Sequence, residues 1–134
     1  MELAEAKRIA QTTERELAEI VPLPLVQSFE QQPKGSLMSC SDGGSHWAGH
    51  SKLTFLAPLD PGELFQSASE KWNGRPGWAA DVGDTGVGSL RIIVQGPGMS
   101  SYILSMAPDG LTARISSMSP CVEVKPGEVR GPFY

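Results

Sequence analysis

The chain has 134 residues, a length typical of one domain with a single hydrophobic core. Its net charge of −4 is mild. The sequence contains no block of Lys and Arg interleaved with aromatic residues, so we do not expect a nucleic-acid surface. No apolar run is long enough to span a membrane, and we expect no signal peptide within the chain. The 15 glycines and 11 prolines favour a turn-rich antiparallel protein over a helical bundle.

Residues 2–21 are predicted to form a helix that ends before Pro22. Apolar and small residues recur at spacings of three and four and define a narrow stripe, whereas the charged side is interpreted as a solvated face. The alanines in the stripe favour close packing on a flat partner such as a sheet. Residues 25–36 are polar and are interpreted as a linker. The stripe consists of Leu3, Ala6, Ala10, Thr13, Leu17 and Ile20.

Two strands, 36–41 and 47–58, are predicted to form a hairpin around a glycine-rich turn that begins at Asp42. A second helix starts at Asp60-Pro61, residues that suit a helix N-terminus, and ends at Gly74. Trp72 lies at helical spacing from other apolar residues, so we interpret it as a core residue rather than a binding aromatic.

The second half of the chain predicts four more strands, at 77–82, 89–95, 101–106 and 111–118. In the last three, apolar residues alternate with polar ones, which is typical of half-buried strands. Tight turns containing Gly96-Pro97-Gly98 and Pro108-Asp109-Gly110 connect them. The expected inward residues are Leu90, Ile92, Val94, Tyr102, Leu104, Met106, Leu111, Ala113 and Ile115.

These elements predict an α+β fold: an antiparallel sheet of about six strands with two helices packed on one face. The expected element order is α-β-β-α-β-β-β-β. We expect residues 1–134 to form one domain, with 1–21 as the N-terminal helical segment and 122–134 as an irregular tail.

The two cysteines, Cys40 and Cys121, each lie at the edge of an expected strand among small polar residues. They are either two separate buried thiols, as in many cytosolic proteins, or a disulfide between the first strand and the end of the last. No Cys-x-x-Cys motif or further ligand accompanies them, so we expect neither a redox motif nor a zinc site. We favour the disulfide, which would indicate an oxidising, extracytoplasmic compartment.

The two histidines, His46 and His50, are four residues apart and would share a face only on a helix, which the neighbouring glycines and the expected strand argue against. A Ser45, His46 and Asp42 triad would need three neighbouring loop residues to converge, and no nucleophile-elbow motif is present. We therefore predict no catalytic residues and no metal ligands.

The sheet face opposite the helices is the remaining candidate surface. Two arginines, Arg91 and Arg114, lie there with hydroxyl residues that include Ser105 and Ser116. Guanidinium groups bind carboxylates through paired hydrogen bonds, so this face could receive an acidic or peptide-like partner. The alternative is an ordinary solvated face. The other predicted members of the face are Ile93, Ser101, Ile103, Thr112 and Met118.

Several short motifs resemble those of uncharacterised lipoproteins secreted by actinobacteria: Leu37-Met38-Ser39-Cys40, Trp47-Ala48-Gly49-His50, Gly77-Trp78 after Trp72, and Ser119-Pro120-Cys121. The resemblance implies a cell-envelope location, a precursor with a signal peptide and an acylated cysteine, and a disulfide between Cys40 and Cys121. This sequence lacks the signal and the acylation cysteine, which leaves membrane anchoring of this chain in question. The family brings no established catalytic residues.

We therefore expect a non-enzymatic cell-envelope binding module that uses no cofactor. Its partner would be an unknown protein, peptide or envelope ligand, with membrane contact only through an N-terminal lipid anchor absent from this chain. One alternative is a hydrolase or metal-dependent enzyme that uses the His46 and His50 region. A second alternative is a small cytoplasmic immunity or adaptor protein, which would be favoured by free thiols at Cys40 and Cys121.

Overall fold

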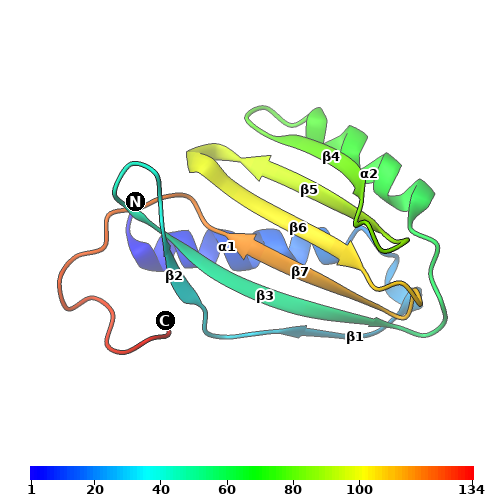
Figure 1. Cartoon of the computed structure of the whole chain (residues 1–134), viewed down its shortest axis with the longest axis horizontal. Helices are drawn as coiled ribbons and strands as arrows, with labels where there is room; N and C mark the ends of the chain where they lie inside the picture. The colour runs from blue at the N-terminus through cyan, green and yellow to red at the C-terminus, as the bar shows by residue number, and fades with distance from the viewer.

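Two helices lie against a seven-stranded antiparallel sheet in the computed structural model, which describes residues 1–134 (Figure 1). The strand order is β1-β3-β7-β6-β5-β4, and β2 also pairs with β3. Single 3-10 turns occupy Leu23–Leu25 and Pro97–Met99. The helices are α1 (Leu3–Ala18) and α2 (Gly62–Asn73), and the strands are β1 (Val26–Gln31), β2 (Ser36–Ser39), β3 (Ser45–Phe55), β4 (Ala79–Asp84), β5 (Leu90–Gly96), β6 (Ser100–Met106) and β7 (Thr112–Met118).

The predicted α+β class is confirmed, and the alternating strands β5, β6 and β7 form its centre. Their register places Ile92 opposite Leu104, and Leu104 opposite Ile115. All three side chains are fully buried, so the period of two in the sequence correctly identified the inner face. Leu111 is the exception: it is 39 % exposed because it lies in the turn before β7 begins.

The predicted linker at residues 25–36 is wrong, because residues 26–31 form strand β1 at the edge of the sheet. β3 is long enough to pair with β1 along its second half and with β2 along its first half. The register shifts between Val26 and Ser28. An irregularity of this kind breaks the alternation, so Val26 and Phe29 lie opposite inward residues of β3 despite their spacing of three.

Both helices cover the same face of the sheet, as predicted. α1 packs on β3, β7 and β6, and α2 packs on β4 and β5; in Figure 1 α1 lies behind the sheet. The small residues Ala6 and Ala10 are fully buried and allow α1 to approach closely. Trp72 of α2 is 7 % exposed and belongs to the core, as expected.

The C-terminal tail contacts Trp47, a core residue that is fully buried. Trp47 Nε1 donates a 2.8 Å hydrogen bond to the Tyr134 carbonyl, and Gly35 and Tyr134 pair through their backbones. The indole lies against the backbone of Gly49, where an added Cβ would fall 2.2 Å from a ring carbon. Any larger residue at position 49 would collide with the Trp47 ring, so this close contact requires glycine.

Tyr102 is a buried residue of β6 whose hydroxyl has no hydrogen-bond partner. Burial raises its pKa above the usual value of 10.0, so the folded protein retains a proton that the unfolded chain loses. Its contribution to stability is complete below pH 10 and decreases as the pH rises toward the folded-state pKa. Because this buried hydroxyl has no partner, we expect Tyr102→Phe to raise the free energy of unfolding by about 1 kcal/mol at pH 7 and to flatten the alkaline decline. Urea unfolding at several pH values checks this; an unchanged alkaline decline would contradict it.

Candidate binding face

The outer face of the sheet, opposite the helices, carries a row of basic side chains that crosses four strands. Arg91 of β5 pairs with Ser105 of β6, which pairs with Arg114 of β7, which pairs with Lys52 of β3. Cross-strand neighbours have Cβ atoms about 5 Å apart. These four residues, here called the cationic row, therefore form a continuous strip perpendicular to the strands.

No side chain of the cationic row takes part in an ion pair within the protein. Arg114 and Lys52 are direct cross-strand neighbours of like charge, an arrangement that destabilises a sheet. The three ion pairs of the structure involve other basic residues, namely Arg8, Arg75 and Lys125. Arg91 Nε is buried and has no hydrogen-bond partner. The row is therefore a positive strip in a chain whose net charge is −4.

A shallow depression of about 450 Å³ lies over part of this row. Its lining includes Lys52, Arg114 and Ser105, together with Glu30 and His50. Lys52, Arg114 and His50 are exposed, so a ligand in the depression can reach their polar atoms. Acidic side chains occur only toward the sheet edges, where Glu30 of β1 pairs with Lys52.

The structure brings three of the four predicted binding residues, Arg91, Ser105 and Arg114, into one row. Ser116 lies in the adjacent row, between Ile103 and His50. Both helices pack on the other face, so neither covers these residues. Lys52 and His50 were missed as members of this surface. In the sequence Lys52 alternates with the apolar residues Leu53 and Phe55, but this pattern could not predict that β3 pairs with β7.

The histidines are not brought together as a metal pair. They lie on one strand four residues apart, which corresponds to about 13 Å along β3. His46 is buried, and its Nδ1 donates to the Ser119 carbonyl at 2.5 Å, whereas His50 is exposed on the outer face. Ser45, His46 and Asp42 make no hydrogen bonds to one another, so the geometry of a catalytic triad is not formed.

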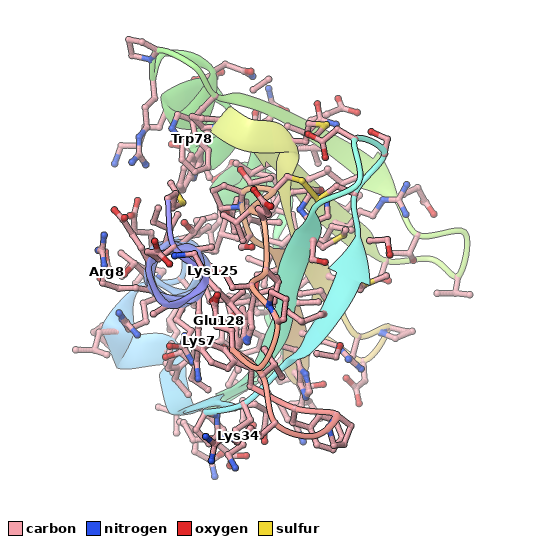
Figure 2. The ribbon with its side chains drawn as sticks, turned by 90° about the vertical axis from the view of Figure 1, so that its left-hand side faces the viewer. Lys7, Arg8, Lys34, Trp78, Lys125 and Glu128 are labelled. Atoms are coloured by element: carbon pink, nitrogen blue, oxygen red, sulfur yellow. A yellow bond between two sulfur atoms is a disulfide. The ribbon has the colours of Figure 1, made fainter.

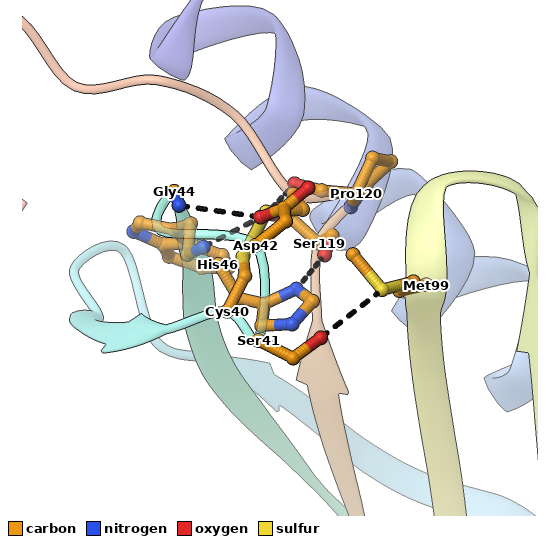
Figure 3. Close-up of a disulfide and its surroundings, with 10 residues drawn as sticks. Cys40, Ser41, Asp42, Gly44, His46, Met99, Ser119 and Pro120 are labelled. Carbon is orange, nitrogen blue, oxygen red and sulfur yellow. Dashed lines mark hydrogen bonds between the residues drawn. A yellow bond between two sulfur atoms is a disulfide. The ribbon is translucent and has the colours of Figure 1, made fainter.

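Cys40 and Cys121 form the disulfide that joins the β2–β3 hairpin to the chain after β7 (Figure 3). Asp42 Oδ1 lies 3.0 Å from Cys121 Sγ and also accepts the Gly44 N–H at 3.2 Å. The two sulfur atoms and one carboxylate oxygen of Asp42 lie within 4.8 Å of one another. Metal binding by cysteine requires thiolates, and sulfurs bonded to each other cannot supply them.

Glu14 was not singled out from the sequence, yet it is the one fully buried acidic side chain of the core face. Its carboxyl group accepts hydrogen bonds from Ser51 of β3 and Ser117 of β7. Gln31 Nε2 also donates to it at 3.4 Å. Because α1 seals this cluster from solvent, it offers no access to a substrate, and we interpret it as a polar connection between helix and sheet.

A search of protein-family models and a search of curated proteins each gave no match. Among solved structures, the chain is similar to a DUF4853 family protein from Actinomyces odontolyticus, with 17 % sequence identity and a TM-score of 0.49. The alignment covers 92 % of this chain and 76 % of that protein. A likeness at this level does not assign a family or a function. The resemblance to actinobacterial lipoproteins therefore stays an expectation from the motifs.

Proposed function

We propose that this protein is a non-enzymatic cell-envelope module that binds an anionic partner on the outer face of its sheet. The observation that carries the proposal is the cationic row, in which Arg114 and Lys52 are adjacent and neither takes part in an ion pair. One acidic residue, Glu30 of β1, pairs with Lys52 at the end of the row. A carboxylate or phosphate placed between Arg114 and Lys52 would relieve their repulsion. The two arginines would hold such groups through paired hydrogen bonds, and Ser105 would supply a hydroxyl between them.

One further observation supports the envelope setting. The Cys40–Cys121 disulfide is typical of oxidising compartments outside the cytoplasm. Neither helix has the length and apolarity needed to cross a lipid bilayer. From the resemblance of the motifs to those of lipoproteins, we propose that membrane attachment comes from an N-terminal lipid anchor. The coding sequence upstream of Met1 tests this, because a lipobox cysteine supports the anchor and its absence refutes it.

The binding proposal is tested by titrating an oligoglutamate peptide into the protein by isothermal calorimetry at low salt. We expect the double variant Lys52→Gln/Arg114→Gln to bind about tenfold more weakly, because two charge-assisted contacts are lost. Binding to the unaltered protein should also weaken as salt is added, since exposed charges are screened.

Arg8→Gln is the control for the single variant Lys52→Gln, which removes the same number of positive charges from the outer face. Arg8→Gln removes one positive charge from α1, on the side away from the sheet, where Figure 2 shows Arg8 pointing outward. This variant should bind the peptide within about twofold of the unaltered protein. Equal losses in Arg8→Gln and in Lys52→Gln would show that net charge, rather than the cationic row, attracts the peptide.

A further inference from the structure

The two helices lie side by side on the sheet but leave a groove of about 360 Å³ between them, within the range of small-molecule sites. Glu16 of α1, together with Glu19 and Ile20 in the turn that follows this helix, forms one wall. The other wall comes from α2 and the residues after it. Its members include Leu64, Lys71, Trp72 and Arg75. The groove thus has an acidic wall facing a basic wall, with apolar side chains between them.

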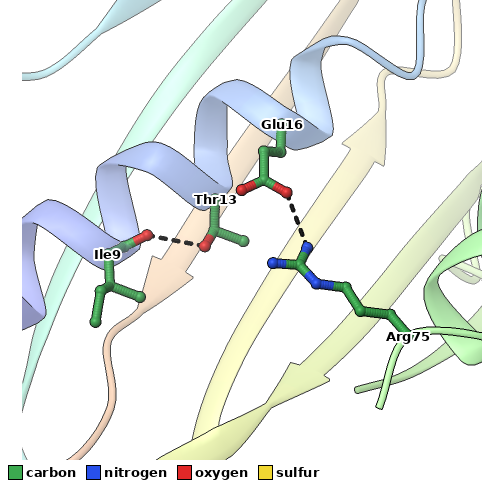
Figure 4. A network of polar contacts seen from close by, with 4 residues as sticks. All are labelled: Ile9, Thr13, Glu16 and Arg75. Carbon is green, nitrogen blue, oxygen red and sulfur yellow. Dashed lines mark hydrogen bonds and ion pairs between the residues drawn. The ribbon is translucent and has the colours of Figure 1, made fainter. Parts of the chain in front are cut away.

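Arg75 closes one end of the groove. Its guanidinium donates a 2.9 Å hydrogen bond to Glu16 across the gap between α1 and the end of α2 (Figure 4). The same guanidinium stacks on the rings of Trp72 and Trp78, at 4.9 Å and 4.6 Å from their centroids. Stacking and ion pairing together hold this end in a defined geometry.

The remaining charges of the groove are unpaired. Glu19 on the acidic wall and Lys71 on the basic wall are both exposed, and neither takes part in an ion pair. Ile20 and Leu64 are half-buried between them and offer an apolar surface. Opposite charges flanking an apolar strip complement a molecule with an ammonium group, a carboxylate and an apolar body.

We propose that this groove binds a small zwitterion with an apolar body, the class formed by apolar α-amino acids and their short peptides. The ligand ammonium pairs with Glu19, and its carboxylate pairs with Lys71 beside Arg75. Its apolar side chain lies against Ile20 and Leu64. This site is on the opposite side of the sheet from the cationic row and does not depend on the function proposed for that row.

Trp72 lines the groove and provides the readout. L-leucine and L-leucyl-L-leucine, which do not fluoresce, are titrated separately while tryptophan emission is recorded. A saturable change is expected with at least one of them, and which one binds more tightly identifies the ligand length. N-acetyl-L-leucine amide has the same apolar body without charges and should bind at least about tenfold more weakly, because both ion pairs are lost.

Glu19→Gln and Lys71→Gln should each weaken binding of the free zwitterion by about fivefold to tenfold. Lys52→Gln, on the outer face, is the control and should leave this affinity unchanged while weakening oligoglutamate binding. The groove proposal is overturned if neither zwitterion gives a saturable change. It is equally overturned if the uncharged analogue binds as well, or if Lys52→Gln weakens binding as much as Lys71→Gln.

Discussion

Replacing Cys40 and Cys121 together with serine should lower the free energy of unfolding by about 4 kcal/mol. The disulfide closes a loop with a sequence separation of 81, which includes β3, α2 and the four strands after it. Without it, the unfolded chain gains the conformational freedom that the bond had removed. The hairpin of β2 and β3 also loses its covalent link to the segment after β7. Urea unfolding followed by circular dichroism measures the loss.

The unaltered protein in excess reductant is the control for this experiment, because it lacks the same bond but keeps both sulfur atoms. Its unfolding midpoint should match that of the double variant. A loss below about 1 kcal/mol in the double variant would contradict the role given to the bond. Two reactive thiols in the denatured, unreduced protein would show that the bond does not form.

Glu14→Ala should lower the free energy of unfolding by about 3 kcal/mol, the second large effect. The substitution removes the acceptor for the hydroxyls of Ser51 and Ser117, both buried, and leaves a cavity under α1. Ser117 keeps only a longer contact of 3.3 Å to the Gly49 carbonyl. An unsatisfied buried hydroxyl is costly because it has lost its hydrogen bonds to water. Urea unfolding at pH 7 measures the change.

Two further variants serve as comparisons for Glu14→Ala. Glu14→Gln keeps the shape and one carbonyl acceptor, so about half of the loss is expected. Glu5→Ala removes an exposed glutamate from the same helix and should change stability by less than about 0.5 kcal/mol. If Glu14→Ala were no more destabilising than Glu5→Ala, the buried cluster would not connect the helix to the sheet as described.

The strongest predictions from sequence came from strands in which one face is buried and the other is solvated. In β5, β6 and β7 apolar and polar residues alternate, and this alternation indicates which side chains are buried. Ile92, Leu104 and Ile115 could therefore be assigned to one face from the sequence. β1 could not be found in this way. Its register irregularity after Val26 resets the alternation, and its polar composition resembles a linker.

Burial of polar residues was harder to predict, because it depends on partners that are distant in sequence. Glu14 lies next to the apolar stripe of α1 but was assigned to its solvated side. Its partners Ser51 and Ser117 are 37 and 103 residues away, and no local pattern connects them. The candidate binding face shows the same limit. Arg91 and Arg114 were assigned to it from alternation, whereas Lys52 joined them only through the pairing of β3 with β7.

The central claim is that the outer face of the sheet, and not the helical side, receives an anionic partner. Amide chemical shifts recorded by NMR during titration with the oligoglutamate peptide test it most directly. The account predicts saturable shifts centred on Lys52, Ser105 and Arg114 and extending to Arg91, with α1 and α2 unaffected. Shifts confined to the helices, or no shifts at low salt, would contradict it.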